Sequence, residues 1–317
     1  MAQQTKWGKA FEYACLNAFW SRLKDIQDVE IVQTPALQTA RNCYYEADSD
    51  MIAKMDAAAE AATRMLFRLE PQLENPNNNT PLLLSVQEDK QGVAGDVRDV
   101  LCIRSQNDWE IGLSCKHNHD AVKHSRLSQT IDFGSLWLGI PCTTQYFLRI
   151  KPVFDLLNEW KEQGIKWRDV KDKEETVYMP ILDAFCEELR LLDTQNPGEV
   201  PSRLLMYLLG RKDFYKIITD DNKKITKVQA FNISGTLNRQ SGTVKPERRV
   251  ERLVPPTKIF NISYKESSQN TIYVHCDNGW WLSFRIHNAS TYVEPSLKFD
   301  VQLKGSPVSL YTQIEPW

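Results

Sequence analysis

The segment GDVRDVLCIRSQNDWEIGLSCKHN, residues 95–118, constrains the fold of this chain more than any other segment. DVLCI at 99–103 and WEIGLSCK at 109–116 predict two strands. The polar turn RSQND that separates them is short, so we expect the strands to be neighbours in one sheet. Asp99 begins the first strand and Lys116 ends the second, and the two side chains are expected to meet across the pair.

The rest of the chain predicts a mixed α/β (α+β) architecture in two parts. Residues 1–212 are expected to form a core with N-terminal helices, and residues 213–317 a β-rich lobe. The helices are expected at 5–24, 48–69, 151–163, 180–192 and 201–209. Further strands are expected at 82–86 and in the segments KITKVQAFNI, TKIFNISY, TIYVHCD, WWLSFRIH and LKFDVQL.

Composition argues against several classes of protein. The chain has 317 residues, of which 42% are hydrophobic and 25% charged, enough for one large domain or two of moderate size. It has no apolar run of about 18 residues, and its start, MAQQTKWGKAFEYA, lacks the layout of a secretory signal. We therefore expect a cytoplasmic protein with no membrane partner. The 7 cysteines are scattered and never spaced C-x-x-C, which argues against a disulfide framework and a structural zinc site.

Charge is unevenly distributed along the chain. The formal net charge is −2, but ten basic residues and only two acidic ones lie between Lys223 and Lys265. This segment is either a surface that faces phosphates or a solvated face of lysine and arginine.

The two predicted strands offer a site for phosphodiester hydrolysis. That reaction needs a divalent cation held by carboxylates, and a group that generates or orients hydroxide. Because side chains alternate along a strand, one face of the second strand is expected to carry Glu110, Gly112, Ser114 and Lys116. The opposite face, in the core, is expected to carry Ile111, Leu113 and Cys115. Taken alone, an Asp-strand-strand-Lys pattern also arises by chance in α/β proteins.

This layout resembles the PD-(D/E)xK nuclease core, in which an aspartate opens one strand and an acid-x-Lys triplet closes the next. Ser114 stands where that family has an acid. The second carboxylate is therefore expected from Glu110, from Glu12 of the first helix, or from Asp96. Glu110 lies on the same face as Lys116, but four residues up the strand from Ser114, or about 13 Å, which is long for a shared ion.

Three histidines follow closely in HNHDAVKHSRLS. His117 and His119 have the spacing of metal ligands, but histidines at a strand end serve equally well as donors to phosphate. The consecutive letters HNH do not match the HNH nuclease motif, whose three residues are spread over a ββα unit.

Taken together, GDVRDVLCIR, WEIGLSCKHNHDAVKHSRLS and IDFGSLW resemble the HaeIII-type family of restriction endonucleases. GRKDFYKII, PPTKIFNISYK and GWWLSFRIHNASTYVEPSLKFDVQLKG in the C-terminal half extend the resemblance along most of the chain. The resemblance implies cleavage of double-stranded DNA in the middle of GGCC with a magnesium ion (Mg2+), leaving blunt ends. It also implies a restriction-modification system in a prokaryotic cytoplasm, with a cognate methyltransferase as functional partner.

The resemblance also assigns roles within the site. Asp99 is expected to bind the metal, and Lys116 to orient or deprotonate the attacking water. The main-chain carbonyl of Cys115 is a further expected ligand. A palindromic target favours a two-fold homodimer with one active site for each strand.

Sequence readout is expected from the C-terminal half. Arginine or lysine reads guanine, and asparagine, glutamine or acids read cytosine in the major groove. In WWLSFRIHN, alternation places Arg285 and His287 on a polar face, with Asn288 beside them, so these three are expected base readers. A surface arginine and a packed histidine are the alternative. Contacts to phosphates are expected from Lys123, Arg126, Arg248 and Arg249, and further contacts to DNA from Asn118 and His124.

Two rival functions fit the same residues. One is a PD-(D/E)xK nuclease of DNA repair or junction resolution that uses Asp99 and Lys116. The other is a DNA-binding protein that does not cut, which Ser114 favours.

Overall fold

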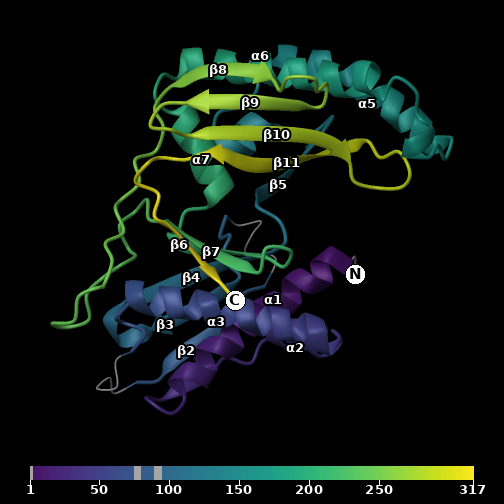
Figure 1. Ribbon diagram of the computed structural model, residues 1–317. Helices are drawn as coiled ribbons and strands as arrows, with labels where there is room; N and C mark the ends of the chain where they lie inside the picture. Colours follow the sequence, from purple (N-terminus) through teal and green to yellow (C-terminus); the bar gives the residue numbers. More distant parts are fainter. Residues whose placement is uncertain (1–2, 75–79, 89–94) are drawn as a thin grey trace. The chain divides into compact units, whose positions relative to one another are not determined.

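The computed structural model describes residues 3–74, 80–88 and 95–317, apart from the side chains of Asn107, Ala121 and His124. The chain divides into two compact units, and each is built from more than one segment (Figure 1). The first unit consists of residues 1–120, 210–253 and 308–317, and the second of residues 121–209 and 254–307. In the described residues, no helix is long and apolar enough to cross a membrane.

The first unit is built on a seven-stranded sheet with the order β1-β2-β3-β4-β6-β7-β12. The pairs β1–β2 and β4–β6 are parallel, and the other pairs are antiparallel. The strands are β1 (Val29–Ile31), β2 (Leu82–Val86), β3 (Val100–Arg104), β4 (Trp109–His117), β6 (Phe214–Asp220), β7 (Ile225–Phe231) and β12 (Thr312–Pro316). The predicted pair of strands at the centre of this sheet is thus confirmed.

Three helices accompany this sheet: α1 (Gln3–Leu23), α2 (Pro35–Tyr45) and α3 (Ser49–Leu69). α1 contacts β4 and α3 contacts β7 (Figure 1). Both helices bury apolar side chains in one core with Ile111 and Leu113. The N-terminus of α3 is capped by Asp48, whose carboxylate accepts from the backbone N–H of Met51 at 2.8 Å. The predicted helices at 5–24 and 48–69 are confirmed.

β4 therefore has two different faces. The inner face, which carries Ile111, Leu113 and Cys115, is covered by the helices. The opposite face is called the outer face below and carries Glu110, Gly112, Ser114 and Lys116. The alternation predicted from the sequence thus places Lys116 outside the hydrophobic core.

The second unit is built on a five-stranded antiparallel sheet with the order β5-β11-β10-β9-β8. Its strands are β5 (Ala121–Ser128), β8 (Ile259–Tyr264), β9 (Thr271–Cys276), β10 (Trp281–Asn288) and β11 (Ser296–Gly305). Its main helices are α5 (Thr144–Glu162), α6 (Met179–Gln195) and α7 (Val200–Leu209), close to the predicted positions (Figure 1). Phe284 of β10 and Phe299 of β11 pack against Phe185 of α6.

The division into units differs from the predicted boundary at residue 212. β6 and β7 lie beyond that boundary but belong to the first sheet, and β5 lies before it but belongs to the second sheet. The physical reason is the parallel pairing of β4 with β6, because parallel neighbours need a long crossover connection. Most of that connection is folded into the second unit.

Candidate active site

Asp99 and Lys116 meet at one end of the β3–β4 pair. The backbone N–H of Asp99 donates to the carbonyl of Leu113 at 2.7 Å, which places the carboxylate beside the end of β4. Asp99 Oδ2 accepts from the backbone N–H of Cys115 at 2.7 Å and from Lys116 Nζ at 3.2 Å. Neither donor engages Oδ1. The predicted meeting of these two side chains is therefore present in the structure.

The Lys116 ammonium is a stable cation in this setting. Burial lowers its pKa, but the charge of Asp99, the hydrogen bond to Asp99 and the nearby Cys115 and Glu12 together outweigh burial, and the net pKa is raised above its ordinary value. The side chain is only 18% exposed. Lys116 is thus a positively charged group beside a carboxylate, suited to stabilise negative charge.

Glu12 is the second carboxylate of this region. It lies on α1 and is 6% exposed, and its Oε2 accepts from Lys9 Nζ at 3.1 Å. Burial, together with the charge of Asp99, raises the pKa of Glu12 to about 8, although Lys9 and Lys116 act in the opposite direction. Glu12 and Asp99 therefore repel one another, and a bound cation would relieve this repulsion.

The other two candidate carboxylates are held by an arginine. Arg98 donates from Nη2 to Asp96 Oδ2 at 2.7 Å and from Nη1 to Glu110 Oε1 at 3.0 Å. Lys212 Nζ also donates to Glu110 Oε1 at 3.1 Å. Burial alone would raise the pKa values of Asp96 and Glu110, but these cations bring both below their ordinary values. The two carboxylates are thus paired, and the structure brings neither into contact with Lys116.

Gly112 makes this arrangement of Arg98 possible. A Cβ atom at Gly112 would lie 2.0 Å from Arg98 Cδ, so the side chain of Arg98 crosses the outer face of β4 where no side chain intervenes.

The donor set at Asp99 fits a magnesium ion. In a strand, the C=O of a residue points to the same side as its N–H. Because the N–H of Cys115 donates to Asp99, the Cys115 carbonyl faces this side as well. In the described part of the chain, no group of three or more His, Cys, Asp and Glu side chains could hold a metal. Mg2+ commonly binds one or two carboxylates together with water and substrate phosphate, so Asp99, Glu12 and one carbonyl suffice.

A buried lysine that the sequence analysis missed lies next to Lys116 on the outer face. Lys216 of β6 is 3% exposed and forms an ion pair with Asp120, which also binds Lys227 Nζ at 2.8 Å. Burial lowers the pKa of Lys216 to about 8, and the charge of Lys116 acts in the same direction. The signal in the sequence is a lysine within the apolar strand FYKII.

The histidine segment connects the ends of two strands. His117 is 6% exposed, and its Nε2 lies 3.0 Å from Asp221 Oδ2. Asn118 has φ of 57° and donates from Nδ2 to the same oxygen at 3.0 Å. Its Oδ1 accepts from the backbone N–H of Asp221 at 2.9 Å. Asn118, an expected contact to DNA, therefore holds the turn after β4.

The expected contacts to DNA differ in how far they are exposed. Lys123 donates to the carbonyl of Tyr207 at 3.0 Å and lies 3.8 Å from its ring centre, and burial lowers its pKa. Arg126 is exposed and donates to Ser296 Oγ at 3.2 Å. Arg248 and Arg249 are exposed on the loop between β7 and β8. His124 lies on β5, and its side chain is outside the described part of the chain.

The expected base readers lie on or beside β10. Arg285 is 54% exposed and forms an ion pair with Asp300 at 3.2 Å. His287 is half-buried, and burial lowers its pKa. Asn288 donates to the carbonyls of Ser290 and Tyr292 and accepts from the N–H of Glu294, so its side chain shapes the following turn. Of the three, Arg285 is the side chain most available to a ligand.

Comparison with known proteins gives a consistent result. A family model described as HaeIII restriction endonuclease matches residues 8–307. The type II restriction enzyme HaeIII of Haemophilus aegyptius is 40% identical over 314 residues, which cover 98% of this chain and 97% of that enzyme. No solved structure matches.

Proposed function

The chain belongs to the HaeIII restriction endonuclease family and is a type II site-specific deoxyribonuclease that acts on double-stranded DNA, and from this premise we propose that it cuts GGCC. The proposed reaction is hydrolysis of both strands in the middle of GGCC, leaving blunt ends. The proposed cofactor is Mg2+. The observation that carries the proposal is the meeting of Asp99 with Lys116 on paired strands, beside the buried carboxylate of Glu12.

The proposed site divides its tasks between three side chains. Asp99 and Glu12, with the Cys115 carbonyl, would hold the cation. When bound, the cation supplies charge stabilisation for the phosphate and lowers the pKa of water. Lys116 is charged, so it orients the attacking water and stabilises the developing negative charge; it does not remove the proton.

A proton is held on Glu12 before the cation binds. With a pKa of about 8, its carboxyl group is mostly protonated at neutral pH. At neutral pH, a cation held by Glu12 and Asp99 would favour the ionised form of Glu12. Binding of the cation is therefore expected to release a proton from Glu12 and to strengthen as pH rises towards 8.

The proposed recognition of GGCC uses the second unit. Arg285 is the proposed guanine reader because it is exposed on β10, and His287 and Asn288 stand beside it. Arg126, Arg248 and Arg249 are proposed phosphate contacts because their side chains are exposed. Lys123 and Asn118 are proposed to stabilise the DNA-binding surface without contacting DNA themselves. Lys123 acts through its contact with Tyr207, and Asn118 through its contact with Asp221.

The target suggests how the enzyme is organised. Because GGCC is palindromic, we propose a homodimer with one active site for each strand. We also propose that the enzyme works in a prokaryotic cytoplasm, where a cognate methyltransferase protects the host DNA.

The proposal is tested by incubating an unmethylated plasmid with the purified protein, with and without Mg2+, and sequencing the ends. The variants are Lys116→Ala and, as a matched control, Lys151→Ala, which removes an exposed lysine of α5. Blunt ends within GGCC that require Mg2+ and Lys116, but not Lys151, are the expected result. Discrete cuts at another sequence would overturn the target, and an intact plasmid to which the protein binds would overturn the reaction.

A further inference from the structure

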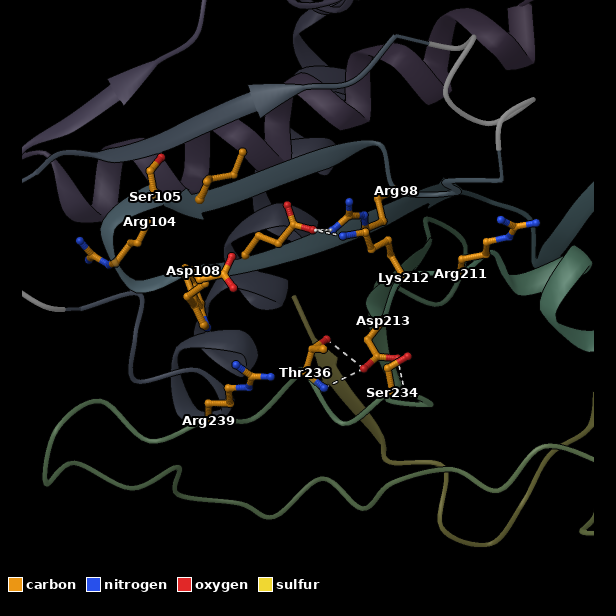
Figure 2. Close-up of a pocket in the computed structure, with 13 residues that line it drawn as sticks. Arg98, Arg104, Ser105, Asp108, Arg211, Lys212, Asp213, Ser234, Thr236 and Arg239 are labelled. Atoms are coloured by element: carbon orange, nitrogen blue, oxygen red, sulfur yellow. Dashed lines mark hydrogen bonds and ion pairs between the residues drawn. The ribbon is translucent and has the colours of Figure 1, made fainter.

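A basic cavity lies near the turn that joins β3 to β4 (Figure 2). Its volume is about 340 Å³. It is lined by the end of β3 and the start of β4, by Arg98 just before β3, by residues just before β6, and by the loop after β7. All of these segments belong to the first unit.

The charge of the lining is positive. The basic residues are Arg98, Arg104, Arg211, Lys212 and Arg239. The acidic residues are Asp108, Glu110 and Asp213. Five cations against three carboxylates leave an excess of two positive charges, which favours an anionic ligand.

Two of the arginines are available to such a ligand. Arg98 is committed to Asp96 and Glu110, and the buried Arg104 donates to the carbonyls of residues 72 and 73. Arg211 and Arg239 are exposed, and neither has an ion-pair partner in the part of the chain that the structure describes. Figure 2 shows them on opposite sides of the cavity.

The loop that carries Arg239 is held in place before any ligand arrives. Asp213 is 5% exposed, and its carboxylate accepts from the backbone N–H groups of Ile233, Ser234 and Thr236 at 2.7–2.8 Å. These hydrogen bonds stabilise the negative charge of Asp213, so the Asp213 carboxylate repels an anion less than a free carboxylate would. They also fix the hydroxyl-bearing residues of the loop beside the cavity, which reduces the entropy lost on binding.

We infer that this cavity binds a phosphate of the DNA backbone outside the recognition sequence. Guanidinium groups match the planar, paired acceptors of a phosphodiester, and exposed serine hydroxyls can donate to it. The inference rests on the proposed function, because it requires DNA over the outer face of the sheet.

The position of the cavity indicates flanking DNA. Glu110 and Lys116 are six residues apart on β4, which is about 20 Å by strand rise. At about 3.4 Å per base pair, this separation corresponds to about six base pairs. A cut in the middle of GGCC leaves only two base pairs of the target on each side, so the phosphate in this cavity belongs to the flank.

The test is a length series in equilibrium binding without divalent cation, so that no DNA is cut. Duplexes of about 10 and about 24 base pairs carry GGCC at the centre, and a second pair carries a permuted sequence. The proteins are wild type, the double variant Arg211→Gln/Arg239→Gln, and Arg41→Gln, which removes an exposed arginine of α2.

The double variant is expected to bind the long duplex about tenfold more weakly and to lower its salt slope by about two, because each protomer of the proposed homodimer loses one phosphate contact. It should bind the short duplex as the wild type does, and Arg41→Gln should match the wild type on both. Equal losses on both lengths, or no loss, would overturn the inference. Calorimetric titration with inorganic phosphate identifies the remaining case. If the wild type binds inorganic phosphate and the double variant does not, while both bind the long duplex equally, the ligand of the cavity is a free anion and not a phosphate of the flanking DNA.

Failure of the proposed target gives a different pattern. If the wild type binds GGCC and the permuted sequence equally, the proposed specificity fails. The length effect of the double variant should still persist on both sequences, because phosphate contacts do not depend on sequence.

Discussion

The β3–β4 pair carries two clusters of carboxylates in opposite electrostatic states. In the paired cluster, Arg98 neutralises Asp96 and Glu110, and the pKa values of both are lowered. In the Asp99 cluster, burial and the charge of Asp99 raise the pKa of Glu12 to about 8. The paired cluster is already balanced, whereas a further cation would stabilise the Asp99 cluster. This difference is the reason why we propose the Asp99 cluster as the catalytic one.

The largest effect expected from this comparison is on cleavage. Asp99→Asn should lower the single-turnover rate about 10³-fold, since it removes the carboxylate that contacts both Lys116 and the proposed cation. Asp96→Asn is the matched change in the paired cluster and should lower the rate by less than about tenfold. Equal losses in the two variants would erase the distinction between the two clusters.

Removal of the arginine should mainly affect stability. Arg98→Met leaves Asp96 and Glu110 without their shared partner, which should lower the free energy of unfolding by about 2 kcal/mol. The effect is below that of a fully buried pair because Glu110 is 35% exposed. Urea unfolding measures it, and Arg41→Gln is the control. A variant as stable as the wild type would show that the ion pairs of Arg98 with Asp96 and Glu110 do not stabilise the fold.

The dependence of stability on pH should identify Glu12. Its pKa is raised from 4.5 to about 8 in the folded protein, so the folded state holds more protons than the unfolded state between these values. Without divalent cation, stability should therefore fall as pH rises from about 5 to 8, by at most about 1.4 kcal/mol per pH unit from this group. Glu12→Gln should remove that part of the slope in urea titrations. An unchanged slope would contradict the raised pKa.

The smallest effect should come from Gly112→Ala. The added Cβ displaces the side chain of Arg98, which should lower the free energy of unfolding by about 1–2 kcal/mol. Urea unfolding of this variant in the Arg98→Gly background, which removes every side-chain atom that the added Cβ would meet at residue 98, provides the check. If the loss persists there in full, it does not act through Arg98.

The sequence predicted the local part of the site because the strand pair is local. A five-residue turn joins strands whose alternation fixes which side chains share a face, so Asp99 and Lys116 could be paired from spacing alone. The helices α1 and α3 were predictable for the same reason, since their apolar residues recur at helical spacing. α2 was missed, although Thr34 and Pro35 are a recognisable helix start.

The rest depended on contacts between distant segments. The parallel pairing of Leu113 with Tyr215 joins residues about a hundred positions apart, and no local pattern reports it. β5 was missed because AVKHSRLS contains three basic residues and forms a strand at the edge of a sheet, beside β11. The choice of the second metal-binding carboxylate among Glu12, Asp96 and Glu110 depended on which carboxylates pair with Arg98. Only the structure shows this pairing.

The most direct test of the account measures Mn2+ binding to the complex of the protein with a GGCC duplex. Mn2+ is a spectroscopic substitute for Mg2+, and its binding is monitored by electron paramagnetic resonance. Lys116→Ala serves as the background, so that the DNA remains uncut during the titration. Adding Asp99→Asn should weaken Mn2+ binding at least about tenfold, whereas adding Asp96→Asn should leave it within about twofold. Loss of Mn2+ binding with Asp96→Asn and not with Asp99→Asn would place the cation in the paired cluster of Asp96 and Glu110 and contradict the account.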